Sequence, residues 1–287
     1  MTQYCYRHPD RPTALSCTRC GRSACPECLR PASVGQHCVD CVNQAQQSAR
    51  ATGPVPAAPT AAADAVPYAT YGLIGVNVVV FLICLAQAGG THMVNSSVMR
   101  NGALITGAGF DDQYWRLLTS GFLHWSVMHL VINMLSLYIV GRDLERIFGT
   151  ARYLAIYLIS LLGGSGLVMA LEGDPTLTAG ASGAIYGLMG ALLVVVLRLK
   201  LSPTTVLIVI GFNLALSIGL PNISLFGHLG GLVFGAASAA AVLWLPTVAL
   251  PPERRTYREV SRVSWIGLGV LLVVALALGT GFAAATG

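Results

Sequence analysis

Ser182 and His228 each stand at the start of an apolar segment that is long enough for a membrane-spanning helix. A serine hydroxyl is a weak nucleophile until a base takes its proton, and a neutral imidazole can take it. In an earlier uncharged stretch, His129 and Asn133 are four positions apart, so they share one face of a helix. Their side chains could donate hydrogen bonds to an oxygen that becomes negatively charged. These four residues have the chemistry for a nucleophilic reaction, provided that the fold brings them together.

Each of these residues also has a simpler interpretation when it is taken alone. A single serine in a membrane helix often bonds to its own backbone, and a single histidine can bridge two helices. Asn213 is an example of such a residue, because nothing in the sequence around it suggests chemistry. The combination of polar residues with the small residues around them is therefore what indicates a site.

Small residues recur every four positions after Ser182 and around His228. Ridges of this kind let two helix backbones approach closely. We therefore expect the two helices to pack together and to bring Ser182 within reach of His228. The two ridges consist of Gly183, Gly187 and Ala191, and of Gly227, Gly231 and Gly235.

The rest of the sequence has the composition of a membrane protein. Of its 287 residues, 54% are hydrophobic and 10% are charged, whereas a soluble domain carries about 25% charged residues. This composition excludes an ordinary soluble enzyme. The longest uncharged stretch, 201–252, is long enough for two spans with a break at Pro221-Asn222. The sequence thus predicts an all-α membrane protein with seven spans, at about 71–88, 126–141, 152–171, 182–199, 204–220, 227–246 and 264–284.

The second and fourth predicted spans are short for a bilayer, and we expect them inside the bundle. Positive charges predict the orientation. With a cytoplasmic N-terminus, all of the 17 Lys and Arg residues except Arg100 and Arg116 lie on the inner side. We therefore expect a multi-pass protein of the cell membrane whose N-terminus is cytoplasmic and whose four polar residues lie toward the outer side.

A separate module is expected at the N-terminus, because seven of the eight cysteines lie between positions 5 and 41. Together with His8 they form four pairs, each with two residues between its members. Such pairs are typical of tetrahedral zinc sites, and eight ligands make two sites. A disulfide framework is disfavoured, because one of the eight is a histidine and the module lies in the reducing cytosol. The pairs are Cys5 with His8, Cys17 with Cys20, Cys25 with Cys28, and Cys38 with Cys41.

The pattern of these pairs resembles a B-box-like zinc finger. The resemblance implies cross-braced sites, with Cys5, His8, Cys25 and Cys28 in one and Cys17, Cys20, Cys38 and Cys41 in the other. Sequential pairing is also sterically possible, and His37 is a further candidate ligand. Closed four-ligand sites are structural, so we expect two structural zinc ions and no cofactor for catalysis. We expect a protein partner for this module; nucleic acid is not expected, because aromatic residues for base stacking are few.

The chain therefore divides into four predicted parts. Residues 1–43 form the cytosolic double-zinc module, and residues 44–67, rich in Ala, Pro, Gln and Thr, form a flexible linker. Residues 68–250 form a core of six spans. Residues 251–287 form a basic cytoplasmic segment and the seventh transmembrane helix.

Five local motifs of the core, in this order and spacing, resemble those of the rhomboid family of intramembrane serine proteases. They cover the region of the first six spans, and the zinc module and the seventh span lie outside it. The motifs are Trp115-Arg116, His124-x4-His129-x3-Asn133, Leu144-Glu145 followed by Gly149, Gly180-Ala181-Ser182-Gly183 with Tyr186, and His228-x2-Gly231-x3-Gly235.

The resemblance implies a six-helix rhomboid-like bundle that cleaves peptide bonds of transmembrane proteins within the lipid bilayer. It implies Ser182 as the nucleophile and His228 as the base, with Tyr186 stacked on the base. His129 and Asn133 would stabilise the oxyanion. His124 would support the loop, and Gly183, Gly231 and Gly235 would allow close packing. Because the fourth to sixth spans contain no Asp or Glu, we expect a dyad and not a triad.

Two other functions compete with this interpretation. An inactive rhomboid-like protein that only binds membrane helices usually lacks the serine or the histidine, and both are present here. A proton-coupled transporter would be expected to carry acidic residues in its spans, and the predicted spans have none.

Overall fold

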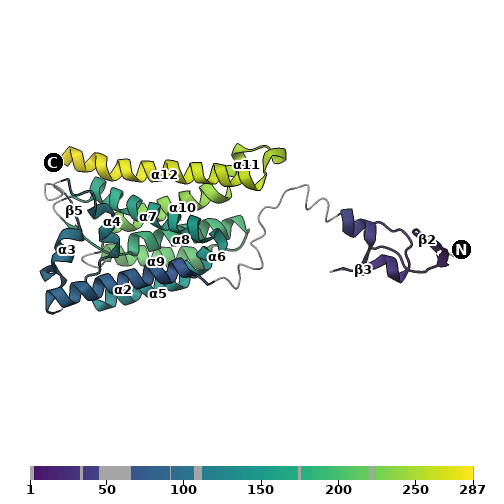
Figure 1. Cartoon of the computed structure of the whole chain (residues 1–287), viewed down its shortest axis with the longest axis horizontal. Coiled ribbons are helices and arrows are strands. Elements are labelled where there is room, and N and C mark those ends of the chain that lie inside the picture. The colour runs from purple at the N-terminus through teal and green to yellow at the C-terminus, as the bar shows by residue number, and fades with distance from the viewer. Residues whose placement is uncertain are drawn as a thin grey trace. The chain divides into compact units, whose positions relative to one another are not determined.

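The computed structural model describes residues 3–32, 35–44, 66–90, 92–106, 112–173, 176–219 and 223–286. Two compact units can be distinguished, an N-terminal module within residues 1–57 and a helical bundle (Figure 1). Most of the predicted linker at 44–67 and the predicted break at Pro221-Asn222 lie outside the described residues.

The N-terminal module consists of two small antiparallel sheets and short helical turns. Apart from its cysteines, the described part of the module buries only Ala24 and Leu29 as hydrophobic residues. A core this small gives little hydrophobic stabilisation, so such a module needs another source of free energy. Its elements are β1 (Tyr4–Cys5) paired with β2 (His8–Pro12), β3 (Leu29–Pro31) paired with β4 (Gln36–Cys38), and η1 (Pro26–Cys28).

The bundle is almost entirely helical, and each of the seven predicted spans coincides with a helical segment. Five helices among the described residues are long and apolar enough to cross a membrane, and α8 and α9 are shorter apolar helices. The elements are α2 (Tyr68–Ala88), η3 (Met93–Asn95), α3 (Ser97–Gly102), β5 (Leu104–Ile105), α4 (Arg116–Thr119), η5 (Ser120–Phe122), α5 (Val127–Ser136), η6 (Leu137–Gly141), α6 (Arg142–Phe148), α7 (Thr150–Leu171), β6 (Leu177–Thr178), α8 (Ser182–Arg198), α9 (Thr204–Gly219), α10 (Leu225–Leu243), α11 (Leu245–Ala249), η7 (Pro252–Arg254) and α12 (Tyr257–Thr286).

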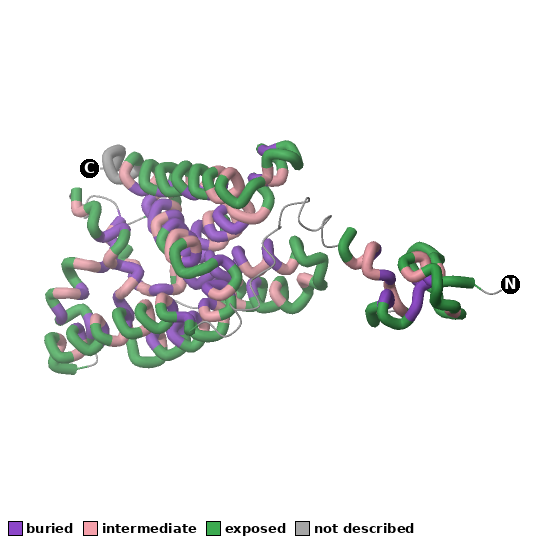
Figure 2. Tube along the Cα trace, turned by 45° about the vertical axis from the view of Figure 1, so that its right-hand side comes forward, coloured by how far each residue is buried: buried purple, intermediate pink, exposed green. Residues whose placement is uncertain are grey.

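The expectation of two short spans inside the bundle is correct for α8 and wrong for the second span. Most of α8 is buried, and Figure 2 shows buried segments gathered in the middle of the bundle. The second span runs from Val127 to Phe148 through α5, the π-helical segment η6 and α6, which makes 22 residues. Its apolar residues Met128 and Ile132 are exposed. The charged residues after Gly141 hide this continuation in the sequence.

Helices α8 and α10 are in backbone contact. A Cβ atom on Gly231 would overlap the carbonyl oxygen of Gly183, and one on Gly235 would overlap that of Gly187. The glycines therefore allow an approach that no side chain would permit. The predicted pairing of the two small-residue ridges is confirmed, and it brings the beginnings of α8 and α10 together.

Glu145 joins the beginning of α2 to the turn after α6. Its carboxylate accepts hydrogen bonds from the backbone N–H groups of Ala69 and Thr70, at 3.0 and 2.8 Å, and from the Thr150 hydroxyl at 3.0 Å. The first N–H groups of a helix have no partner within the helix, so a carboxylate there is stabilising. Gly149, with a φ of 76°, lets the chain turn from α6 into α7.

The seventh span, α12, packs along the bundle beside α7 and α10 (Figure 1). A Cβ on Gly166 of α7 would lie 3.2 Å from the carbonyl oxygen of Ala275, and one on Gly267 would lie 2.9 Å from Cβ of Ala241 on α10. Arg152 donates a hydrogen bond of 3.0 Å to Ser261. The α12 helix is thus an integral part of the bundle.

Candidate active site and metal-binding groups

A cavity of about 410 Å³ lies between α5, α8, α9 and α10. Its lining includes Ser182, His228, His129, Asn133 and Tyr186. The structure thus brings together the four polar residues and the tyrosine that the sequence singles out, although they come from three separate helices.

Ser182 and His228 are hydrogen-bonded to each other. The distance from Ser182 Oγ to His228 Nε2 is 2.8 Å. Ser182 is the first residue of α8, and His228 lies in the first turn of α10. The Ser224 hydroxyl accepts the N–H of Gly227 at 3.0 Å and so caps α10 just before the histidine. His228 is buried and Ser182 is partly exposed to the cavity.

Two further side chains hold the His228 imidazole. The Tyr186 ring is stacked on it, with the centroids 3.9 Å apart and the planes at 12°. Ser217 Oγ, on α9, lies 2.7 Å from His228 Nδ1. The sequence does not single out Ser217, because a serine that faces another helix has no local signature.

His129 and Asn133 line the same cavity and both belong to α5. The Ser126 hydroxyl caps this helix by accepting the N–H of His129 at 3.2 Å. The Asn133 amide donates to the carbonyl oxygen of His129 at 2.8 Å. The two side chains therefore share one face of α5, as their spacing predicts.

Gly180 keeps a space open between His129 and Ser182. A Cβ at Gly180 would lie 3.0 Å from His129 Nε2 and 3.5 Å from Ser182 Oγ. Its φ of 148° is also a conformation that side chains disfavour. Any other residue at this position would fill part of the cavity beside the serine hydroxyl.

His124 lies behind His129 and not in the cavity lining. It is fully buried, and its ring meets the edge of the His129 ring at a centroid distance of 5.0 Å. Neither ring nitrogen has a hydrogen-bond partner among the described residues. His124 therefore packs against His129, and its loop-supporting role stays a prediction.

Trp115 and Arg116 are not part of this cavity lining and bind the C-terminal end of α3. The buried guanidinium of Arg116 donates to the carbonyl oxygens of Arg100 and Ala103, at 2.8 and 2.6 Å. Trp115 Nε1 donates to the carbonyl oxygen of Asn101 at 3.0 Å. Burial lowers the pKa of Arg116.

No Asp or Glu lines the cavity in the described part of the chain. Glu172, which follows α7, contacts the N-cap of α10: its carboxylate accepts a hydrogen bond of 3.1 Å from Ser224. Burial raises the pKa of Glu172. The partners of the two His228 ring nitrogens are hydroxyl groups, so the imidazole has no carboxylate partner.

The N-terminal module contains two groups of four candidate metal ligands. They are Cys5, His8, Cys25 and Cys28, and Cys17, Cys20, Cys38 and Cys41. This is the cross-braced arrangement, and the sequential pairing that the sequence leaves open is not what the structure has. All eight cysteines of the chain, each in a described range, are free. His37 belongs to neither group.

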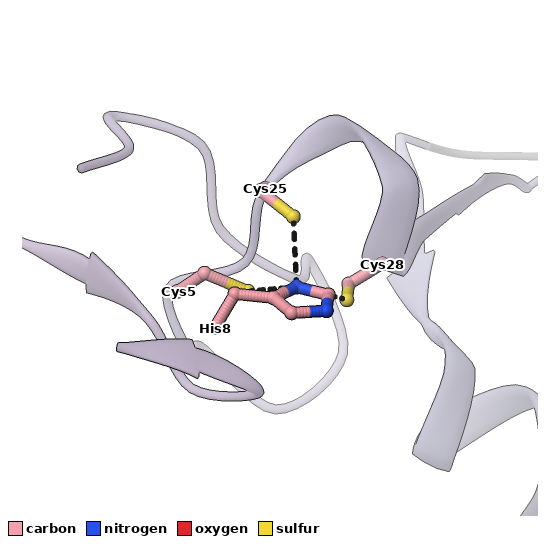
Figure 3. A group of neighbouring side chains, drawn as sticks. All are labelled: Cys5, His8, Cys25 and Cys28. Atoms are coloured by element: carbon pink, nitrogen blue, oxygen red, sulfur yellow. Dashed lines mark hydrogen bonds between the residues drawn. The ribbon is translucent and has the colours of Figure 1, made fainter. Parts of the chain in front are cut away.

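Both groups have the dimensions of a zinc site. In the first group, the three sulfur atoms lie 3.4 to 3.8 Å from His8 Nδ1 (Figure 3). Around tetrahedral zinc, sulfur and nitrogen ligands are about 3.6 Å apart and two sulfurs about 3.8 Å. In the second group, the sulfurs of Cys20 and Cys38 are 3.7 Å apart, and the Cys38 N–H donates to Cys17 Sγ at 3.2 Å. Two zinc ions fit these donor sets.

The helices and the cavity define an integral membrane protein with polar residues enclosed between apolar spans. Residues 111–245 match the family model of the rhomboid domain. The chain therefore carries a rhomboid domain over these residues.

Several curated relatives are similar to this chain. The rhomboid protease GluP of Bacillus subtilis (strain 168) is 34% identical over 218 residues, which are 74% of this chain and 40% of GluP. RHOMBOID-like protein 2 of Arabidopsis thaliana is 38% identical over 180 residues, 59% of this chain and 56% of that protein. Inactive RHOMBOID-like protein 8 of Arabidopsis thaliana is 33% identical over 154 residues, 50% of this chain and 43% of that protein. The matches thus span about half of the relatives' own lengths, or less.

Proposed function

We propose that this chain is an intramembrane serine endopeptidase with Ser182 as its nucleophile and His228 as its general base. The observation that carries the proposal is the hydrogen bond of 2.8 Å between Ser182 Oγ and His228 Nε2 inside the cavity. A nucleophile and a base within hydrogen-bond reach are the minimum for acyl transfer. The similarity to GluP, a rhomboid protease, supports the same reaction class.

The proposed reaction has two steps, acylation and deacylation, and His228 accepts and returns one proton in each. His228 takes the Ser182 proton as Oγ attacks the peptide carbonyl, and it gives that proton to the leaving amine, so the peptide C–N bond breaks and an acyl ester forms. A water molecule then enters, His228 takes its proton, and the ester is hydrolysed. The proton returns to Ser182.

The oxyanion forms in the space beside Gly180. His129 Nε2 faces this space, and the backbone N–H of Ser182 is at the beginning of α8, where helix N–H groups have no partner within the helix. Both groups donate to the negative oxygen. Asn133 lines the same cavity. One N–H of its amide donates to the carbonyl oxygen of His129, and the other is a further donor to the oxyanion in this proposal.

The base acts without a carboxylate. Hydroxyl and aromatic groups surround the imidazole, and they orient it without adding a charge. A Ser-His dyad is therefore the catalytic unit we propose.

The substrates we propose are transmembrane proteins, cut near the outer face of the membrane. Bilayer-exposed residues of α5, Met128 and Ile132, also line the cavity, so an apolar segment can reach it from the lipid. The charge distribution supports a cytoplasmic N-terminus, because only Arg100 and Arg116 then lie outside. With this orientation the beginnings of α5, α8 and α10 lie on the outer side.

The N-terminal module, in this proposal, holds two structural zinc ions and serves as a cytoplasmic interaction module for a protein partner. All four ligand positions of each group come from the protein, which leaves no position for a reacting water. Catalysis therefore needs no metal.

The second candidate function is binding of membrane helices without cleavage. We consider this function because one of the similar proteins, RHOMBOID-like protein 8, is inactive. A fluorophosphonate probe for serine hydrolases distinguishes the two. We expect the probe to label the wild-type chain in detergent and not Ser182→Ala, with Ser264→Ala labelled like the wild type. Absence of labelling in a folded wild-type chain that also leaves a transmembrane substrate intact would favour the binding function.

A further inference from the structure

The second nitrogen of the His228 ring is engaged by a residue outside the proposed dyad. Ser217 Oγ lies 2.7 Å from His228 Nδ1, and both side chains are buried. Ser217 comes from α9 and His228 from α10, 11 positions later in the chain. The imidazole is thus held between two serine hydroxyls, one at each nitrogen.

The surroundings of Ser217 favour one direction for this hydrogen bond. A hydroxyl has one proton and can accept two further hydrogen bonds. Ser217 Oγ lies 3.0 Å from the carbonyl oxygen of Asn213, which can only accept. If the single hydroxyl proton is donated to that carbonyl, the bond to His228 must use the Nδ1 proton. All three groups are then satisfied, which matters in a buried site.

This direction of the hydrogen bond selects one tautomer of His228. With the proton on Nδ1, the lone pair is on Nε2 and points to the Ser182 hydroxyl. That tautomer is the one a general base needs. The other tautomer would place a proton on Nε2, and His228 could not accept the serine proton.

We propose that Ser217 is a positioning residue that holds His228 in the Nδ1-protonated tautomer and aims Nε2 at Ser182. The proposal rests on the proposed protease function for its kinetic consequence, whereas the tautomer itself does not depend on it. Tyr186 limits tilting of the ring by stacking, and Ser217 limits rotation within the ring plane. Ser217 therefore orients the imidazole as the aspartate of a Ser-His-Asp triad does, but without a negative charge.

A bond of a membrane serine to its own helix backbone is common and needs no functional explanation. Ser160 and Ser264 are of this kind, with bonds of 2.6 and 2.9 Å to the carbonyl oxygens of Ile156 and Val260. Ser217 makes the same local bond, and in addition it contacts the base. This second contact is what separates Ser217 from the others.

The experiment measures the tautomer directly in the full-length chain in detergent. The ring nitrogens are ¹⁵N-labelled, and long-range ¹H–¹⁵N correlation spectra identify which nitrogen carries the proton. His228→Gln identifies the signals, since the chain has six histidines. We expect a protonated Nδ1 and an unprotonated Nε2 in the wild type and in Ser217→Thr. In Ser217→Ala we expect a mixture of the two tautomers.

The kinetic arm uses the same variants on a model transmembrane substrate. We expect Ser217→Ala to lower kcat by about 10- to 100-fold with KM little changed. The loss is smaller than the whole contribution of a general base, because His228 itself is still present. Ser217→Thr should recover most of the rate, and Ser264→Ala, a buried hydroxyl remote from the cavity, should keep it.

The outcomes separate this proposal from the proposed function. A wild type with its proton on Nε2, or a Ser217→Ala chain with unchanged tautomer and kcat, would overturn the role of Ser217. A wild type with the expected tautomer that neither reacts with the serine probe nor cleaves would overturn the protease function and leave the tautomer assignment standing. If Ser217→Ala does not fold, the spectra of the wild type and Ser217→Thr still show whether Nδ1 of His228 carries the proton.

Discussion

The Tyr186 ring lies flat on the His228 imidazole, 3.9 Å away and within 12° of parallel. Both residues face the cavity, and they come from two helices, α8 and α10, that are in backbone contact. The stack therefore fixes the plane of the proposed base relative to the helix that carries the proposed nucleophile.

We predict that Tyr186→Phe keeps most of the cleavage rate and that Tyr186→Ala lowers kcat by about five-fold or more. An aromatic stack contributes about 1 kcal/mol beyond its buried area, which Phe retains and Ala loses. Steady-state kinetics on a transmembrane substrate measure the difference. Equal losses in both variants would mean that the Tyr186 hydroxyl, 3.5 Å from Ser217 Oγ, matters more than the stack.

Ser182→Ala and His228→Ala should each abolish cleavage, and the double variant should be no worse than either. Residues that act as one unit give non-additive losses, because the second substitution removes nothing that the first has left. Turnover of the single and double variants, measured at matched concentrations of folded protein, checks this. Losses that multiply would show that the two residues act independently, and residual cutting at the same bond by Ser182→Ala would refute its role as nucleophile.

Asn133→Ala should lower kcat by about 100-fold or more with little change in KM, since oxyanion donors act mainly in the transition state. Asn77→Ala is a matched control: its amide makes the same bond to its own helix, 2.8 Å to the Leu73 carbonyl, and it lies outside the cavity lining. We expect the control to affect thermal stability more than turnover. An unchanged kcat in Asn133→Ala would remove this residue from the site.

Gly231→Ala should separate α8 from α10 and lower both stability and activity. The added Cβ overlaps the Gly183 carbonyl oxygen, and forced overpacking costs about 1–3 kcal/mol. The displacement also lengthens the contact between Ser182 and His228. Gly269→Ala, on an open face of α12, is the control and should behave like the wild type. Thermal melting and probe labelling of both variants test the prediction; a fully stable and active Gly231→Ala would contradict the packing argument.

Purified full-length chain should contain two zinc ions, and Cys25→Ser should lower the content of its own group and spare the other. Cys84→Ser, the one cysteine outside the two groups, should retain both ions. Metal analysis gives the stoichiometry. A chelator should unfold the module, which buries little besides its cysteines, and should leave cleavage intact. A chain that binds no metal, or a chelator that stops cleavage by a chain starting near Ala63, would contradict the structural role.

The sequence alone predicts those parts of the structure that depend on local patterns. Each pair of metal ligands sits in a short turn, so its spacing is visible, and Ser182 and His228 open apolar helices within recognisable motifs. The regular spacing of small residues likewise predicts which two helices touch. These features need no knowledge of the rest of the chain.

Contacts between distant segments are not visible in this way. The Ser217 contact with His228 depends on how α9 lies against α10, and no spacing rule specifies that. The extension of the second span to Phe148 could not be predicted either. From the sequence, Glu145 would be taken for an exposed charge, because its hydrogen-bond partners on α2 are 75 and 76 positions earlier. In each case a tertiary hydrogen bond decides the role of a residue whose local sequence is uninformative.

The contact between Gly183 and Gly231 also limits how this protein can change over generations. An ordinary core contact tolerates a larger side chain when the facing residue becomes smaller. Here the facing residue is already glycine and the obstacle is a backbone carbonyl, so no second substitution can make room. We therefore expect accepted changes to accumulate on the lipid-facing side of α5, around residues such as Val131 and Leu135, and the line of glycines between α8 and α10 to stay fixed.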